Sequence, residues 1–337
     1  MKLYSGIDLH SNNSVVVLLD EEDQTVYQRQ LGNDLQTILA ALEPYREKIQ
    51  GLAVESTYNW YWLVDGLMEA GYQVHLVNTA AVKQYEGLKH GDDRTDARWL
   101  AHLLRLGILP QGYIYPKEGR AVRDLLRKRG QLVQMRTTNL LSIQTLITRN
   151  TGSSLSANKV KKLQSEQVAE LLPCEDTALA VNSNLSIMKA LQEQIKILEK
   201  IIQQKAKLQA EYAALKTVPG IGIILALTIM LETGPIQRFA KVGNYASYCR
   251  CVGTTRLSNG KQKGKGNAKN GNRYLSWAFV EAANFAIRYN DSIKAYYQRK
   301  QAKTNRVVAL KTVAHKLARA CYYILRDQVE CDLKKAF

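Results

Sequence analysis

The sequence predicts an α/β domain at the amino terminus and a largely α-helical remainder. Strand-like runs come first, long helical periodicities follow, and the charge changes sign between the two parts. Residues 1–110 hold 9 Lys and Arg against 15 Asp and Glu, whereas residues 111–337 hold 38 against 15. This imbalance, within a net charge of +17, indicates a polyanionic partner that is bound mainly by the second part.

The first part shows the order of elements expected of a ribonuclease-H-like domain. The expected strands cover residues 3–9, 14–19, 25–31, 51–54 and 73–77. The expected helices cover residues 35–45, 60–70 and 91–104. Three consecutive strands followed by alternating helices and strands predict a hairpin-rich sheet that is extended by βα units.

Four acidic residues fall where such a sheet would gather them. Asp8 lies at the end of the first strand and Glu55 at the end of the fourth, so neighbouring strands would bring both carboxylates to one edge. Asp93 and Asp96 are three residues apart and share one face of the following helix. Each acid taken alone is explained as a turn, strand-end or helix-capping residue. Together they predict a site for Mg²⁺ or Mn²⁺ acting on a phosphodiester.

The second part is expected to contain two long helices. Apolar residues at helical spacing among many Arg and Gln predict a basic helix over 118–149, followed by a loop at 151–158. A second helix is expected over 186–215. It carries a heptad seam formed by Met188, Leu191, Ile195, Leu198 and Ile202. The seam is compatible both with a helical hairpin within the chain and with a contact between subunits.

A glycine-containing turn and a basic window follow these helices. The run Val218-Pro-Gly-Ile-Gly222 is typical of a helix–hairpin–helix whose backbone N–H groups bind phosphate, and equally of a tight interhelical turn. Between Thr233 and Val280 there are nine Lys and Arg and no acid. Its Gly-, Asn- and Lys-rich centre, 256–272, is expected to be a phosphate-binding loop that is disordered without ligand. The candidate nucleic-acid contacts are Gly220, Gly222, Arg256, Lys261, Lys263, Lys265, Lys269 and Arg273. Closing helices are expected over 273–287 and 293–325.

Composition also predicts a cellular setting. The chain opens directly into a strand-like run, and its longest apolar run, 221–231, is too short to span a bilayer. Five irregularly spaced cysteines lack the paired spacing of a zinc site. We therefore expect a cytoplasmic protein with reduced thiols and no membrane partner.

The motifs around the four acids resemble the DEDD set of the IS110 family of insertion-sequence transposases, relatives of the Piv DNA invertase. The likeness rests on Gly-Ile-Asp8, Val-Glu55-Ser and Asp-Asp93-Arg-Thr-Asp96-Ala, of which the last is the most specific. The Val-Pro-Gly-Ile-Gly222 turn and the Ser258-Asn-Gly loop resemble the second domain of that family. The likeness covers nearly the whole chain, roughly residues 3–326.

The resemblance implies a DNA transposase or site-specific recombinase that cleaves and rejoins DNA. Its three parts would be a RuvC-like domain over 1–117, a basic coiled-coil region for oligomerisation over 118–216, and a small helical transposase domain over 217–327. The metal ligands would be Asp8, Glu55, Asp93 and Asp96, and Ser258 would form a covalent phosphoserine intermediate.

The resemblance also implies partners. These are donor and target DNA, an element-encoded guide RNA, and further copies of the chain in a dimer or tetramer, where the serine of one subunit completes the metal site of another. One stretch departs from the family pattern. Where the family usually has Ser-Lys-Arg-Gly, this chain has Ala268-Lys269-Asn270-Gly271, which removes a rival serine and an Arg contact.

Other classes of function explain less of the sequence. The main alternative is a RuvC-like, structure-selective endonuclease that uses metal-activated water and has no covalent step. An actin-like ATPase or sugar kinase also begins with a Gly-Ile-Asp strand, but residues 10–13 are not a glycine-rich phosphate loop. A non-catalytic nucleic-acid-binding protein accounts for the charge and leaves the four acids unexplained.

Overall fold

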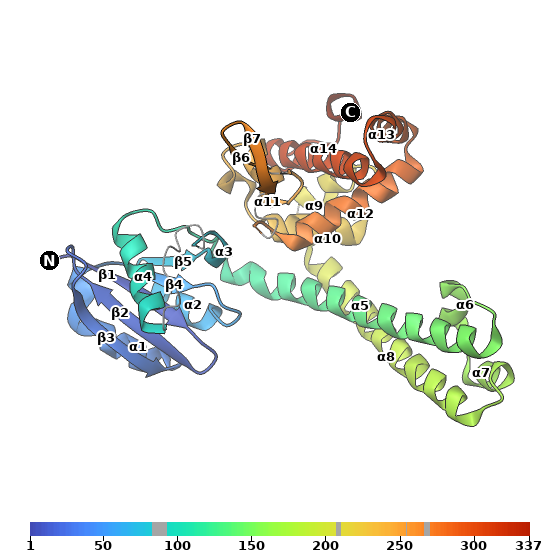
Figure 1. Ribbon diagram of the computed structural model, residues 1–337, viewed down its shortest axis with the longest axis horizontal. Coiled ribbons are helices and arrows are strands. Elements are labelled where there is room, and N and C mark those ends of the chain that lie inside the picture. Colours follow the sequence, from blue (N-terminus) through green and yellow to red (C-terminus); the bar gives the residue numbers. More distant parts are fainter. Residues whose placement is uncertain (83–92, 207–209, 254, 266–269) are drawn as a thin grey trace. The chain divides into compact units, whose positions relative to one another are not determined.

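The structure is a computed structural model that describes residues 1–82, 93–206, 210–253, 255–265 and 270–337. It comprises two compact units, Met1–Lys117 and Glu118–Phe337 (Figure 1). The first unit is α/β and the second is mainly helical, so the predicted division into an α/β part and a helical part is confirmed. The further division of the second part at residue 216 stays a prediction, because residues 118–337 form one unit.

The first unit is built on a five-stranded mixed sheet with the strand order β3-β2-β1-β4-β5. The strands are β1 (Leu3–Leu9), β2 (Asn13–Leu19), β3 (Thr25–Gly32), β4 (Ile49–Glu55) and β5 (Val74–Val77). Strands β1 to β3 form antiparallel pairs, whereas β4 lies parallel to β1 and β5 parallel to β4. The central strand β1 is therefore covered by neighbours on both sides, which places its end in the middle of the sheet edge.

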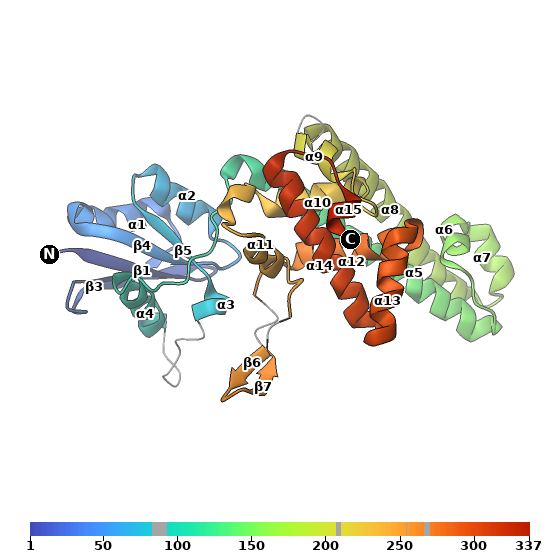
Figure 2. The same cartoon turned by 90° about the horizontal axis from the view of Figure 1, so that it is seen from above.

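Helices cover both faces of this sheet, as Figures 1 and 2 show. They are α1 (Leu35–Leu42), α2 (Tyr61–Glu69), α3 (Thr79–Val82) and α4 (Asp93–Arg105), with a 3₁₀ turn, η1 (Glu43–Lys48), after α1. Side chains of β2 alternate between two hydrophobic clusters, because Val16 and Leu18 pack with residues of α1 and α2, and Val15 and Val17 pack against α4. Burial on both faces explains why the central strands are almost continuously apolar.

The second unit begins with an antiparallel pair of long helices, α5 (Lys117–Thr151) and α8 (Glu175–Ala206). Hydrogen bonds link Arg129 to Glu199 and Asn184 to Ser142, which sets the antiparallel register. Met188 of the predicted seam packs in one cluster with buried residues of α5. The helical hairpin, one of the two uses left open for the seam, is therefore present, and the contact between subunits stays a prediction.

The remaining helices of this unit pack around a single large hydrophobic cluster. They are α9 (Ala210–Leu215), α10 (Ile223–Thr233), α11 (Val242–Tyr248), α12 (Arg273–Tyr289), α13 (Asp291–Lys303), α14 (Arg306–Asp327) and α15 (Leu333–Ala336), with a 3₁₀ turn, η3 (Ile236–Arg238). Tyr245 and Phe279 are fully buried and form an edge-to-face pair in this cluster. All five cysteines are free thiols. Within the described residues, every helix is too short or too polar to cross a lipid bilayer.

Two predicted helical segments are corrected by the structure. Instead of starting at residue 186, helix α8 begins at Glu175; it is described to Ala206 and α9 from Ala210, and residues 207–209 between them lie outside the described residues. The predicted segment 293–325 is divided between α13 and α14 at Asn305, whose side chain accepts a hydrogen bond from the backbone N–H of Val308 and so starts a new helix. The loop after α5 is also shorter than expected, because α6 (Ala157–Lys162) and α7 (Ser165–Leu171) follow it.

The basic stretch expected to be a disordered loop contains a β-hairpin. Strands β6 (Thr255–Ser258) and β7 (Lys261–Lys265) pair antiparallel around the two-residue turn Asn259-Gly260. Both turn residues have positive φ, 48° and 69°, as a type I′ hairpin turn requires. Asn-Gly is the sequence typical of that turn, although the flanking strands contain few apolar residues. We call residues 255–265 the serine hairpin.

Candidate active site

Two of the predicted acids lie side by side at one edge of the sheet in the first unit. Strands β1 and β4 are parallel, and Ile7 is paired with Val54, so Asp8 and Glu55 follow at the same level. Asp8 is almost fully buried, at 3% exposure, while Glu55 is half-buried. Since parallel strands end at the same edge, the fold of the backbone alone brings these carboxyl groups together.

The pKa of Glu55 is affected by burial and by the neighbouring acids Asp8 and Asp96. The pKa of Glu55 is raised to about 8, first by burial, then by a hydrogen bond with Asp8, and then by the negative charges of Asp8 and Asp96. Two carboxylates this close cannot both remain ionised without a nearby cation. Without such a cation, the pair therefore holds a proton at neutral pH.

Helix α4 adds the other two predicted acids, in its first turn. It lies against β1 at a glycine, because a Cβ atom on Gly6 would stand 1.9 Å from the carbonyl oxygen of Ala97 and 2.7 Å from the amide nitrogen of Ala101. Ala97 and Ala101 are themselves fully buried. Small residues on both elements thus permit the close approach that brings Asp93 and Asp96 near the strand ends.

A residue that sequence reasoning placed only in a polar turn joins these acids. The imidazole Nε2 of His10 lies 3.2 Å from Asp8 Oδ2 and 3.3 Å from Asp93 Oδ2. Ligand atoms of Asp8, His10 and Asp93 all lie within 4.8 Å of one another. The signal was available in the sequence, because Asp8 and His10 are two residues apart and alternate residues leave a strand on the same side.

The four predicted acids therefore meet at one place, and His10 lies among them. Asp8 contacts Glu55 and His10, Asp93 reaches the group through His10, and Asp96 acts on Glu55 electrostatically. We call Asp8, Glu55, Asp93 and Asp96 the acid cluster. Its oxygen atoms are the ligand type that Mg²⁺ prefers.

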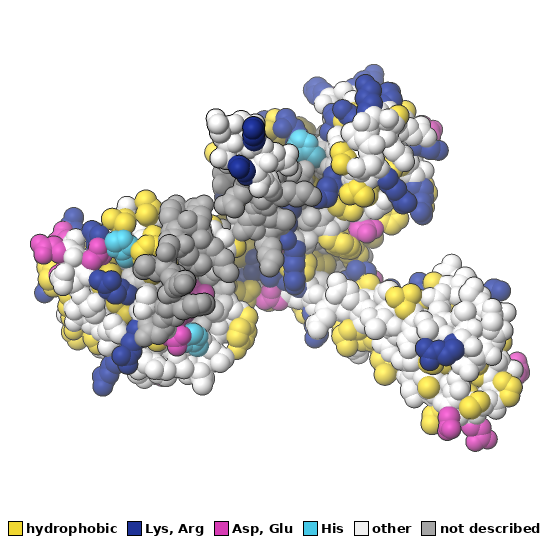
Figure 3. All heavy atoms as spheres, viewed as in Figure 1, with side chains coloured by type: hydrophobic (Ala, Val, Ile, Leu, Met, Phe, Trp, Pro, Cys, Tyr) yellow, Lys and Arg dark blue, Asp and Glu magenta, His cyan; other side chains and the backbone are white. Residues whose placement is uncertain are grey.

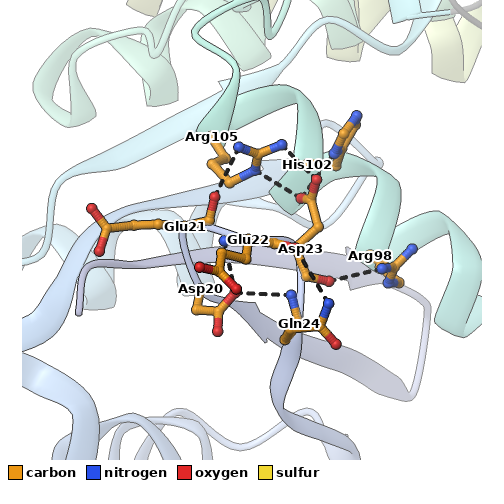
Figure 4. A network of polar contacts seen from close by, with 8 residues as sticks. All are labelled: Asp20, Glu21, Glu22, Asp23, Gln24, Arg98, His102 and Arg105. Carbon is orange, nitrogen blue, oxygen red and sulfur yellow. Dashed lines mark hydrogen bonds and ion pairs between the residues drawn. The ribbon is translucent and has the colours of Figure 1, made fainter.

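The opposite end of α4 is fixed by the turn between β2 and β3 (Figure 4). The Asp23 carboxylate accepts hydrogen bonds from Arg105, with Nε at 2.8 Å, and lies 2.9 Å from His102 Nδ1. Arg98 donates to the Asp23 carbonyl at 2.8 Å. Burial alone would raise the pKa of Asp23, but the hydrogen bonds and charges of Arg105 and His102 outweigh it and lower that pKa. Three side chains of one helix face thus converge on a single turn residue, which fixes the orientation of α4 on the sheet.

Ser258, in the second unit, lies in a different kind of environment. It is the last residue of β6, directly before the Asn259-Gly260 turn, and is exposed. The side chains of Lys261, Gln262 and Lys263 in the same hairpin are exposed as well. Figure 2 shows β6 and β7 standing apart from the helices of their unit.

The chain segment that carries the serine hairpin returns to the helices at a fixed point. The Asn272 side chain donates to the Glu232 carboxylate at 2.7 Å, and its oxygen caps α12. Glu232 is 2% exposed and is paired with Arg127, with an Nε to Oε1 distance of 2.6 Å. Gly271 has φ of 91°, and a Cβ atom there would stand 2.4 Å from the Tyr248 carbonyl oxygen. The base of the segment is therefore tightly packed, in contrast to its tip.

The other predicted nucleic-acid contacts are spread over the second unit. Lys261 and Lys263 are exposed on β7, and Arg273 is exposed at the start of α12. Arg256 and Lys265 are placed by their backbone in β6 and β7, and Lys269 lies outside the described residues.

The glycines of the predicted helix–hairpin–helix have separate structural roles. Gly220, with φ of 85°, packs so close to α12 that a Cβ atom would stand 2.2 Å from the Ala282 carbonyl oxygen. Gly222 is the N-cap residue of α10. Together with Phe285 and Tyr289, residues 216–225 line a cleft, most of whose side chains are hydrophobic. Packing against α12 explains Gly220, so phosphate binding at this turn stays a prediction.

Comparisons with known proteins agree across both units. A family model described as transposase matches residues 5–150, and a model described as transposase IS116/IS110/IS902 family matches residues 212–298. An uncharacterised 43.6 kDa protein of insertion element IS110 from Streptomyces coelicolor is 26% identical over 150 residues, which span 44% of this chain and 37% of that protein.

Two other relatives align over most of their length. An uncharacterised 44.8 kDa protein of insertion element IS116 from Streptomyces clavuligerus is 21% identical over 97% of this chain and 95% of its own. The transposase for insertion sequence element IS1111A from Coxiella burnetii is 22% identical over 84% of this chain and 78% of its own. The similarity thus extends over both units of the chain.

Proposed function

The chain belongs to the IS110 family of transposases, and from this premise we propose that it is a metal-dependent DNA recombinase with a serine nucleophile. Membership of the family makes it an enzyme of DNA transposition. The observation that carries the finer proposal is the convergence of Asp8, Glu55, Asp93 and Asp96 at one edge of the sheet.

We assign the first unit to the ribonuclease-H-like folds of the RuvC type. The strand order β3-β2-β1-β4-β5, with three antiparallel strands followed by two parallel ones, supports this assignment. In this arrangement the end of the central strand carries Asp8, and the next strand carries Glu55. The proposed site thus lies at the carboxyl ends of neighbouring parallel strands, where open α/β sheets generally bind ligands.

The donor set of the acid cluster fits Mg²⁺, with Mn²⁺ as a substitute. Asp8, Glu55, Asp93 and Asp96 would hold it, because their oxygens are hard ligands and their mutual repulsion calls for a cation. The ring nitrogen of His10 is buried and makes no hydrogen bond, although it faces two carboxylates. When bound, such an ion stabilises charge on the attacking and leaving oxygens of a phosphodiester.

Ser258 is the proposed nucleophile. Its Oγ would attack the phosphorus, a serine–phosphate bond would form, and the bond to the departing sugar oxygen would break, with the serine proton ending on that oxygen. No water is consumed, so the ester bond is conserved and a second DNA hydroxyl can displace the serine to rejoin the strand. Exposure of Ser258 at a hairpin turn and the neighbouring charges of Lys261 and Lys263 support this role.

Nucleic-acid binding is proposed to lie mainly on the second unit. Lys and Arg side chains gather over α13 and α14 on the face shown in Figure 3. These helices contain Lys294, Arg299, Lys300, Lys303, Arg306, Lys311, Lys316, Arg319 and Arg326. A surface of this kind binds phosphates irrespective of sequence, so target choice would require a further element. We propose that an element-encoded RNA supplies it and that the active form is an oligomer, as the family resemblance implies.

The proposed metal site is tested by Asp8→Asn in a DNA strand-cleavage assay. We expect cleavage to fall by roughly a thousandfold or more, because several kcal/mol of transition-state stabilisation are lost. DNA binding should be retained, since the basic unit is unchanged. Glu47→Gln, which removes an exposed acid elsewhere in the same unit, is the control and should cleave normally.

Cleavage by Asp8→Asn, or by the wild type in EDTA, would refute the metal site. Cleavage that needs metal but produces no protein–DNA adduct would favour the alternative, an endonuclease that uses metal-activated water. All four acids belong to the first unit and Ser258 to the second, so the endonuclease alternative uses the first unit without the serine.

A further inference from the structure

Among the described residues around the acid cluster, the imidazole of His10 is a group that the DEDD motif does not account for. Its Nε2 atom is shielded from solvent and makes no hydrogen bond, although the ring as a whole is 36% exposed. The same atom lies 3.2 Å from Asp8 Oδ2 and 3.3 Å from Asp93 Oδ2, in directions unsuited to hydrogen bonding. A polar atom that is buried without a partner is costly, and a bound cation would satisfy it.

The distances from His10 Nε2 to the two carboxylate oxygens are those of adjacent ligands around one ion. Adjacent ligands of an octahedral ion, each about 2.1 Å from the metal, stand about 3 Å apart. The two distances from His10 Nε2 are close to this value, and all three ligand atoms lie within 4.8 Å of one another. We propose that His10 is a nitrogen ligand of the metal ion bound by Asp8 and Asp93. This inference rests on the proposed metal site and specifies its chemistry.

The backbone of His10 is fixed in a way that suits a ligand. Asn33 and Asn59 each donate a side-chain N–H to the His10 carbonyl oxygen at 2.9 Å. Asn33 is itself oriented by the Ser14 hydroxyl at 2.7 Å, and Asn59 by the Thr57 hydroxyl at 2.9 Å. Side chains from two separate loops thus hold one turn residue, and such outer contacts generally orient metal ligands.

A nitrogen ligand would change which metal the site prefers. Carboxylate oxygens alone suit Mg²⁺, whereas imidazole binds first-row transition ions better than it binds Mg²⁺. The site with His10 is therefore expected to bind Mn²⁺ more tightly relative to Mg²⁺ than the acid cluster alone would. Loss of the imidazole should reduce the difference between the affinities of the site for Mn²⁺ and for Mg²⁺.

The test is metal binding by the full-length protein, with Mn²⁺ measured by electron paramagnetic resonance and Mg²⁺ by competition. We expect His10→Ala to weaken Mn²⁺ binding roughly tenfold or more and Mg²⁺ binding less. In the wild type, pulsed spectra of bound Mn²⁺ should show coupling to a ¹⁴N nucleus, and this coupling should vanish in His10→Ala. His10→Asn provides a second variant with a polar side chain in the turn, and His315→Ala, in the second unit, is the control that should retain the coupling.

Two results would overturn the inference. Mn²⁺ bound without nitrogen coupling in the wild type would show a metal site made of oxygen ligands only, which leaves the proposed function intact. Unchanged binding of both ions by His10→Ala and His10→Asn would show that the imidazole is not a ligand, and tighter binding would show that it competes with the metal. If Mn²⁺ binds equally to the wild type and to Asp8→Asn, the proposed metal site itself is wrong.

Discussion

The acid cluster and the serine hairpin differ in how the fold positions them. Asp8 and Glu55 lie at the ends of central parallel strands, and α4 reaches them by packing directly on Gly6. Ser258, in contrast, is exposed beside the turn of a two-stranded hairpin, and the tightly packed residues Gly271 and Asn272 follow that hairpin in the chain. One half of the proposed chemistry is thus preorganised by a hydrophobic core, whereas the other half is presented on a surface element. We infer that substrate or partner binding must complete the position of the serine.

If the acid cluster is positioned by the core, the substitution Gly6→Ala should have the largest effect on stability and metal binding. The new methyl group would overlap the backbone of α4 at Ala97 and Ala101, so the helix must move away from β1. We expect a loss of about 3 kcal/mol in the free energy of unfolding of the first unit. Metal binding and DNA cleavage should be lost with it, because Asp93 and Asp96 move with the helix. Calorimetry and a metal titration measure both effects.

Gly32→Ala is the matched control for this prediction. Gly32 also lies in the sheet of the first unit, but a Cβ atom there meets no atom within 4 Å. Its stability and metal binding should stay near those of the wild type. Normal metal binding by Gly6→Ala would show that the acid cluster does not depend on the close approach of α4.

A smaller effect is expected from Asp23→Asn, which weakens the contacts at the other end of α4. Hydrogen bonds to the Asp23 carboxylate lower its pKa in the folded protein, so its contribution to stability is present above the pKa of the unfolded chain and is lost as the pH falls through the folded pKa. At pH 7 we expect the variant to be less stable by about 1 kcal/mol. The difference should shrink below about pH 4.

Thermal unfolding of both proteins between pH 3 and pH 8 checks the Asp23 prediction. A stability difference that grows on acidification would contradict the assignment of the ionised carboxylate as the stabilising form. Loss of metal affinity in Asp23→Asn without loss of stability would instead show that the contact acts mainly by orienting Asp93 and Asp96.

The sheet and the four acids could be predicted from the sequence because they depend on local patterns. Apolar runs bounded by polar turns mark β1 and β2. Asp8 and Glu55 can be placed together because each lies at the end of its strand and the two strands are parallel neighbours. The spacing of His10 from Asp8 is a local signal for its place in the site, but the fixed position of its backbone could not be derived in the same way. It depends on Asn33 and Asn59, which are distant in sequence and reach the same carbonyl only in the folded chain.

The errors in the second unit have local causes as well. The composition around the serine hairpin, where β7 consists only of Lys, Gln and Gly, predicts a disordered loop, although Asn259-Gly260 is a strong turn signal. The break between α13 and α14 depends on one capping residue, Asn305, within an otherwise continuous helical pattern. In both places a signal of one or two residues determines the local structure, whereas the composition of the surrounding stretch predicts something else.

The most direct test of the whole account is the covalent adduct expected between Ser258 and DNA. A suicide DNA substrate, which prevents rejoining, is incubated with the full-length protein, the proposed element-encoded RNA and Mg²⁺, and the products are separated on a denaturing gel. We expect an adduct with the wild type and with Ser153→Ala, which removes an exposed serine elsewhere in the second unit. Ser258→Ala should fold normally, with an unchanged melting temperature, and give no adduct, and Asp8→Asn should give none either. An adduct formed by Ser258→Ala, or by the wild type in EDTA, would contradict the account.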